Sequence, residues 1–171
     1  MIGPSDRTAA MLPIPTSRLQ FEVVREVNAA PHVVFDALTS EAGMQAWVPL
    51  CRSAEWRHPP GRNVPGKDSV RYIVLAGGLV AAERIIDWRE GRELHYTFDQ
   101  SSIPLGAVTT RYVGTTRVES GGSASTRLTW AIHFDAPGWQ AALAPIMRLN
   151  LRGFIGLMAS NVRRIAEAAN R

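Results

Sequence analysis

The chain has 171 residues, 46% of them hydrophobic and 20% charged, a composition typical of one soluble globular domain with a substantial core. The formal net charge is +4, and the 19 basic residues are scattered along the chain, so a nucleic-acid-binding face is not indicated. A lone Cys51 excludes a disulfide within the chain, and the longest apolar run, 73–82, is too short to span a bilayer. We therefore expect a cytoplasmic protein with no transmembrane segment.

The chain begins with a segment that does not resemble a core element. Its first 18 residues contain three prolines and no continuous apolar stretch. They predict a flexible N-terminal arm, 1–18, ahead of a single domain, 19–171. At the start of that domain, residues 19–28 alternate between apolar and polar side chains, which predicts a half-buried strand.

Two short helices are predicted directly after this strand. Pro31 opens the first, 31–39, because its missing N–H costs nothing in a first helical turn. Ser40 can cap the second, 41–46, which ends near Trp47. The pair offers neither a nucleophile nor an acid–base pair. We interpret it as a brace that closes one end of a cavity, with Trp47 near the mouth.

Six further strands are predicted from the alternating residues that follow and from the turns between them. They cover 52–58, 68–76, 79–88, 93–100, 107–119 and 125–136. The pair Gly77 and Gly78 predicts a tight hairpin turn between the second and third of these strands. Gly121 and Gly122 predict another between the last two.

The last segment changes period. From Trp139 to about residue 169, apolar residues recur at steps of three and four, which predicts a long amphipathic helix. Pro145 marks either a kink or the true start of this helix. Strands followed by a separate helix are typical of an α+β domain, in which a bent antiparallel sheet can wrap around the helix and leave a gap.

Three features carry a family resemblance: the stretch VNAAPHVVFDALTSEAGMQAWVP, the stretch ERIIDWREGRELHYTF, and the final helix. Together they resemble the START/Bet v 1-like superfamily, also called SRPBCC, and within it the bacterial polyketide cyclase/dehydrase-like branch, over about 19–169. The resemblance implies a helix-grip fold: a curved antiparallel sheet of about seven strands around a long C-terminal helix, with two short helices after the first strand. It implies no shared catalytic residue, because its members include ligand carriers, cyclases and interaction proteins.

The sequence holds no motif for cofactor, metal or nucleophile chemistry. G-x-G-x-x-G, the P-loop, C-x-x-C, H-E-x-x-H and G-x-S-x-G are all absent. The four histidines lack metal-ligand spacing, and Cys51 has no identifiable histidine partner. We therefore expect neither a metal nor a cofactor.

Strand alternation and helix period nominate the side chains that line the predicted cavity, with plain core packing as the alternative for each apolar member. The candidate ligand-pocket residues are Trp47, Tyr72, Tyr96, Phe98, Trp130, Ile132, Phe134, Met147, Asn150, Leu151, Phe154 and Met158. The same patterns point polar groups inward, and these are the candidates for chemistry.

The candidate catalytic residues are Arg25, Tyr72, Tyr96 and Asn150. An inward arginine needs a partner, so Arg25 either pairs with a carboxylate or holds an anionic group of a ligand. The two tyrosines can donate to a polarised oxygen or simply pack, and Asn150 can bind a ligand carbonyl or a strand backbone.

Three functions remain open. The first is binding of a small hydrophobic molecule, aromatic, polyketide-like or lipid-like, in the internal cavity. The second is a polyketide cyclase/dehydrase-like reaction in that cavity, and the third is a protein-interaction or regulatory module. No nucleic-acid partner is expected, and a long edge strand can pair two copies into a homodimer.

Overall fold

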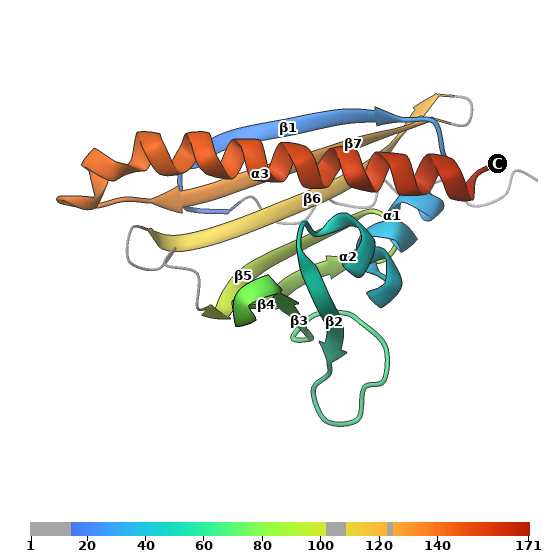
Figure 1. Ribbon diagram of the computed structural model, residues 1–171, viewed down its shortest axis with the longest axis horizontal. Coiled ribbons are helices and arrows are strands. Elements are labelled where there is room, and N and C mark those ends of the chain that lie inside the picture. Colours follow the sequence, from blue (N-terminus) through green and yellow to red (C-terminus); the bar gives the residue numbers. More distant parts are fainter. Residues whose placement is uncertain (1–14, 102–108, 123–124) are drawn as a thin grey trace, which may run out of the picture.

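The computed structural model describes residues 15–101, 109–122 and 125–171, and its elements follow the predicted order (Figure 1). They are β1 (Leu19–Val27), α1 (Pro31–Thr39), α2 (Glu41–Trp47), β2 (Cys51–Arg57), β3 (Val70–Leu75), β4 (Val80–Arg89), β5 (Glu93–Ser101), β6 (Thr110–Gly122), β7 (Ser125–Asp135) and α3 (Gln140–Ala169). The strands form one 7-stranded sheet in the order β1-β7-β6-β5-β4-β3-β2. Every neighbouring pair is antiparallel.

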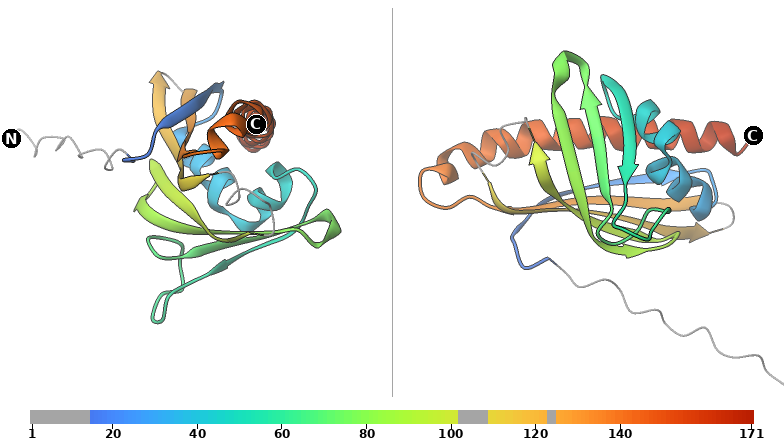
Figure 2. Two further views of the ribbon diagram at one scale, coloured as in Figure 1. Left: turned by 90° about the vertical axis from the view of Figure 1, so that its left-hand side faces the viewer. Right: turned by 90° about the horizontal axis from the view of Figure 1, so that it is seen from below.

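The sheet curves around α3, which is seen along its axis in the left panel of Figure 2. Strands β1 and β7 run beside the helix, whereas β4, β3 and β2 turn away from it (Figures 1 and 2). The short helices α1 and α2 both contact α3. This arrangement is the helix-grip fold that the sequence predicted.

The short helices are joined as predicted. Pro31 occupies the first turn of α1, and Ser40 both ends α1 and caps α2, its Oγ accepting a hydrogen bond from the Gly43 N–H at 3.1 Å. Trp47 ends α2, and its Nε1 donates to the Ala37 carbonyl at 2.9 Å. Because Trp47 is buried, its predicted place near a cavity mouth is wrong: it lies inside the fold.

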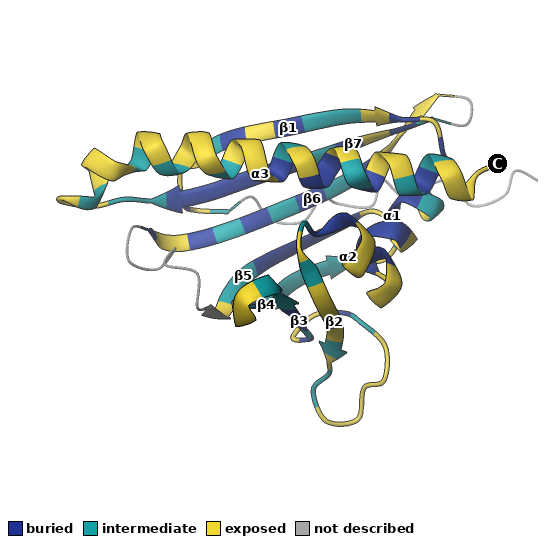
Figure 3. Cartoon of the chain, in the orientation of Figure 1, coloured by how far each residue is buried: buried dark blue, intermediate teal, exposed yellow. Residues whose placement is uncertain are grey.

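The two halves of α3 differ in burial, as Figure 3 shows. In the second half, Ile155, Met158, Ala159, Val162 and Ala166 are buried. Most residues of the first half are exposed, although the same sheet lies below. The helix begins ahead of its proline, at Gln140, so Pro145 is not its start.

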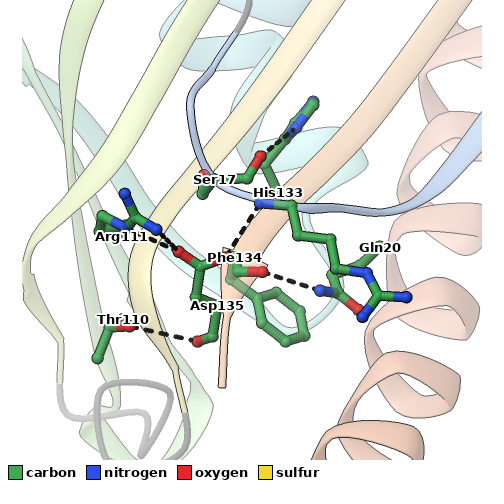
Figure 4. Close-up of polar contacts among 8 residues, drawn as sticks. Ser17, Gln20, Thr110, Arg111, His133, Phe134 and Asp135 are labelled. Atoms are coloured by element: carbon green, nitrogen blue, oxygen red, sulfur yellow. Dashed lines mark hydrogen bonds and ion pairs between the residues drawn. The ribbon is translucent and has the colours of Figure 1, made fainter. Parts of the chain in front are cut away.

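The segment ahead of β1 is attached to β7 (Figure 4). The Ser17 carbonyl lies 3.4 Å from His133 Nδ1, and the Arg18 N–H donates to Asp135 Oδ1 at 3.1 Å. The end of the predicted flexible arm is therefore held by hydrogen bonds. The rest of that arm, 1–14, lies outside the described residues.

Candidate functional site

A cavity of about 460 Å³ lies between the sheet and the middle of α3. Its lining is contributed by α2, β3, β4, β5, β6, β7 and α3, and by the turn between β3 and β4. Nearly all of the lining side chains are apolar or aromatic. A cavity of this size and character is typical of a site for a small organic ligand.

The β3–β4 hairpin places one ion pair in this apolar lining. Gly77 and Gly78 turn the chain with φ of 80° and 77°, and the resulting register sets Arg71 directly opposite Glu83. Arg71 Nε donates to Glu83 Oε2 at 2.6 Å, and Nη2 lies 2.5 Å from the same oxygen. Arg71 is only 1% exposed. Each charge therefore depends on the other, since either one alone would be buried without a partner.

Aromatic rings fix the position of this ion pair. Arg71 Cζ lies 5.5 Å from the centre of the Trp47 ring and 5.0 Å from that of Tyr96, within the range of cation–π attraction. The Tyr96 ring crosses β6 at Gly114, where a Cβ atom would lie 2.1 Å from Tyr96 Cζ. The missing side chain of Gly114 is thus what allows the Tyr96 ring to lie beside Arg71.

The Tyr96 hydroxyl is a neutral hydrogen-bonding group in the cavity wall. Trp130 Nε1 donates to Tyr96 Oη at 3.0 Å. Burial raises the pKa of Tyr96, and the negative charge of Glu83 raises it further, against the opposing effects of Arg71 and of hydrogen bonds from Trp130 and Tyr112. Burial likewise raises the pKa of Tyr112 well above its usual value. Both phenols keep their protons at neutral pH, so Tyr96 can donate a hydrogen bond where Glu83 can accept one.

The opposite wall of the cavity comes from α3 and carries no charge. Its lining members are Met147, Asn150, Leu151, Phe154, Ile155 and Met158. Asn150 Nδ2 donates to the Ile146 carbonyl one turn back in the same helix, at 3.0 Å, and not to a strand. Phe154 and Leu79 both line the cavity and are both exposed, so they mark its mouth between α3 and the β3–β4 turn.

Most of the predicted pocket residues line this cavity. They are Trp47, Tyr96, Phe98, Trp130, Met147, Asn150, Leu151, Phe154 and Met158. Ile132 and Phe134, predicted from the same alternation of β7, are fully buried in the hydrophobic core and do not reach the cavity lining. Contact of any of these residues with a ligand stays a prediction.

Tyr72 does not line the cavity, and the expectation that it faces inward is wrong. Arg57 Cζ lies 3.7 Å above the centre of its ring, on the face of β3 turned away from α3. The inward residues of β3 are Arg71 and Ile73. The hydrophobic pattern assigned the two faces the wrong way round because an arginine occupies an inward position.

Arg25 also lies outside the cavity lining. It sits between β1 and α3, where its Nε donates to Ser160 Oγ at 3.2 Å and its Nη2 to the Gly156 carbonyl at 3.4 Å. In these contacts, the partners of Arg25 on the helix are neutral. Of the four candidate catalytic residues, it brings Tyr96 and Asn150 to the cavity.

Sequence reasoning missed Arg71, Glu83 and Tyr112. A signal for the first two was present. A hairpin turning at Gly77 and Gly78 with this short loop places Arg71 across from Glu83, and opposite charges at facing positions of a hairpin indicate a pair. No comparable signal marked Tyr112, because the next residues on its face of β6 are Gly114 and Thr116, and neither is apolar.

Other kinds of site find little support in the described ranges. There, no group of three or more His, Cys, Asp or Glu side chains is placed to hold a metal ion. Burial raises the pKa of Cys51, so its thiol is not activated as a nucleophile. Among the helices described, none has the length and apolarity to cross a membrane.

Comparison with known proteins identifies a family and similar folds. A family model described as "Polyketide cyclase / dehydrase and lipid transport" matches residues 18–169. The solved structure of norcoclaurine synthase from Thalictrum flavum, in complex with dopamine and hydroxybenzaldehyde, has a TM-score of 0.68 at 12% identity, covering 91% of this chain and 90% of that one. A protein from Thermus thermophilus has a TM-score of 0.63 at 16% identity, with 88% and 98% covered. The protein XoxI from Bacillus cereus has 0.60 at 18%, with 88% and 94% covered. None of the curated proteins matches the chain.

Proposed function

The chain belongs to the polyketide cyclase / dehydrase and lipid transport family, and from this premise we propose that its cavity binds a small hydrophobic molecule with one polar end. The observation that carries the proposal is the Arg71–Glu83 pair, buried in a lining that is otherwise almost wholly apolar. A buried ion pair is often no more stable than apolar side chains of the same volume. Its place in the cavity wall therefore supports a role in recognition rather than in stability alone.

The lining supports a particular ligand chemistry. Tyr96 offers a hydrogen-bond donor and Glu83 an acceptor, so a ligand hydroxyl can use both, whereas a carbonyl can use only the first. Phe98 and Leu151 offer apolar surface to the remainder of the molecule, which suits an aromatic, polyketide-like or lipid-like body. The polar end then lies beside the sheet and the apolar body beneath α3.

Matched ligands test this proposal. We expect naphthol to bind saturably and more tightly than naphthalene, and we expect Tyr96→Phe to remove most of that difference, about tenfold in dissociation constant for one lost hydrogen bond. Native mass spectrometry and thermal shift measure both affinities. Tyr72→Phe is the matched control, since that ring faces away from the cavity. Equal binding of both ligands by wild type and Tyr96→Phe would contradict the proposed polar end.

A cyclase/dehydrase-like reaction is the second candidate function, and the pairing of Glu83 with Tyr96 in one cavity favours it. Glu83 can take a proton from a carbon between two carbonyls, and Tyr96 can donate a hydrogen bond to the enolate oxygen that forms. Turnover of a poly-β-ketone surrogate, followed by chromatography, tests this step. Loss of turnover in Glu83→Gln with surrogate binding retained supports catalysis; unchanged turnover excludes these residues from it.

The open cavity supports ligand binding over a module that acts only by protein interaction. The unpaired thiol of Cys51 fits a reducing compartment such as the cytoplasm. Neither a metal nor a cofactor is needed for the proposed binding.

A further inference from the structure

From its N-cap to Leu157, α3 presents apolar side chains to solvent on the side opposite the sheet. At about 100° per residue, the helix period brings a set of apolar residues, including the N-cap, to one side of the helix. We call this side the apolar face. Its residues are Trp139, Ala142, Pro145, Ile146, Leu149 and Leu157, and all are exposed. Leu149 is 73% exposed, Trp139 69% and Ile146 62%. A helix on the surface of a protein normally turns polar residues to this side, so an apolar face here indicates a binding partner.

Ahead of Glu167, the charged residues of α3 have one sign. No Asp or Glu occurs in 136–166, whereas this range contains four arginines. The helix period places Arg148 and Arg152 along one flank of the apolar face. Arg148 also lines a surface hollow with Arg18 and Arg111, in which Asp135 is the only carboxylate among the lining residues. Figure 4 shows Arg111 paired with Asp135 at the end of β7.

The other flank of the apolar face leads to the mouth of the cavity. Phe154 on α3 and Leu79 on the β3–β4 turn are exposed there. The Ala76 N–H donates to the Leu50 carbonyl at 2.8 Å, which holds the turn beside Leu50. The side chain of Leu50 is exposed as well. The segment 73–82 has no charged residue, so the apolar surface continues from the helix across the mouth.

We propose that the apolar face of α3 docks the protein onto an anionic phospholipid bilayer, with the mouth of the cavity turned toward the membrane. An exposed tryptophan and aliphatic side chains beside arginines are what an interfacial helix uses to insert between headgroups. The arginines then face the negative surface potential of the bilayer. Docking rests on the surface of α3 alone; only the passage of a ligand from the bilayer into the cavity rests on the proposed function.

Vesicle co-sedimentation tests the proposal with the full chain. We expect binding to vesicles of phosphatidylcholine mixed with phosphatidylglycerol, weaker binding to phosphatidylcholine alone, and a decrease as salt is raised. Trp139 is the exposed member of the five tryptophans, so its fluorescence is expected to shift to the blue on binding. Equal binding to both kinds of vesicle, or binding to neither, would overturn the proposal.

Variants separate the two components of the surface. Ile146→Gln with Leu149→Gln removes apolar side chains, and Arg148→Glu with Arg152→Glu reverses the flank; each is expected to weaken binding about tenfold or more. The matched control is Leu19→Gln with Val64→Gln, because both side chains are exposed and lie outside the apolar face. Circular dichroism checks that each variant is folded. If either α3 variant binds as wild type does, the assigned surface is wrong.

Two measurements distinguish this proposal from its alternatives. Light scattering of wild type and Ile146→Gln/Leu149→Gln tests whether the face pairs two copies of the chain; a dimer lost in the variant, without vesicle binding by wild type, would overturn membrane docking. Tyr96→Phe tests the cavity separately, and we expect it to bind vesicles as wild type does. Failure of ligand binding and failure of docking are therefore separate results.

Discussion

The two walls of the cavity are built differently. The sheet wall is charged and fixed: Arg71 and Glu83 bind one another, and Tyr96 is held between Trp130 and Gly114. The helix wall is uncharged and half-exposed, and its one polar lining side chain bonds only within its own helix. The sheet wall therefore owes more of its stability to side-chain contacts than the helix wall does.

Under the proposed function, this difference gives ligand recognition to the sheet wall and ligand access to the helix wall. A group that must meet a polar atom of a ligand at a set position needs partners that hold it in advance, which the sheet wall has. Unbranched or partly exposed side chains such as Met147 and Phe154 can change rotamer at little cost. Substitutions in the sheet wall should therefore lower the free energy of unfolding, whereas substitutions in the first half of α3 should not.

The largest effect is expected from Arg71→Met. It leaves the Glu83 carboxylate buried without its partner, and we expect the free energy of unfolding to fall by about 3 kcal/mol or more. Urea denaturation measures the change. Adding Glu83→Gln removes the stranded charge, so the double variant should recover a large part of the loss.

Arg84→Met is the matched control for this experiment. Arg84 is on β4 next to Glu83, and its Nη2 lies 2.8 Å from Asp99 Oδ2 in an exposed pair. Exposed pairs contribute about 1 kcal/mol or less, so this variant should remain near wild type. If Arg71→Met and Arg84→Met lose the same free energy, burial of the first pair has no special cost and the contrast between the walls fails.

A pair of glycines sharpens the comparison. In the sheet wall, Gly114→Ala places a Cβ 2.1 Å from Tyr96 Cζ, and we expect overpacking to cost about 1–3 kcal/mol of unfolding free energy. In the first half of α3, Gly153→Ala meets nothing within 4 Å and should stabilise the helix by about 1 kcal/mol. Thermal and urea unfolding of both variants give the sign directly. Opposite signs are expected, and two destabilised variants would show that α3 is as constrained as the sheet.

The sequence predicted the fold because its signals were local. Residue alternation, the Gly77 and Gly78 turn, the Ser40 cap and the period of the final helix each act over a few residues, and the structure confirms each of them. The order of elements then agrees with the family resemblance. The halves of α3 were not told apart, since the same apolar period runs through both and only tertiary contacts bury the second.

The site was less predictable for a physical reason. Hydrophobic alternation assumes that inward positions are apolar, and that assumption fails where two inward charges neutralise one another, as Arg71 and Glu83 do. It placed Tyr72 inward for this reason. Hydrophobic alternation placed Tyr96 on the correct face. Its raised pKa, however, depends on burial by strands that are distant in the sequence, so no local pattern predicts it.

The smallest effect is expected for His133, on the outer side of the sheet wall. β7 carries Trp130 on the cavity side and His133 on the outer side, beside the Ser17 carbonyl. Burial lowers the pKa of His133, and the His95 side chain lowers it further, against the raising effects of Ser17 and Glu22. The folded protein therefore binds a proton at His133 less readily than the unfolded chain does.

The sign of the pH dependence follows from this shift. Below the ordinary histidine pKa of about 6.5, the unfolded chain takes up a proton that the folded protein resists, so the free energy of unfolding falls as the pH falls toward the folded pKa of His133. Urea denaturation at about pH 7 and about pH 5.5 should show less of this loss in His133→Gln than in wild type, a difference of about 1 kcal/mol or less. His32→Gln, on the exposed side of α1, should lose as much as wild type. An unchanged loss in His133→Gln would show that His133 is not the source of the acid sensitivity.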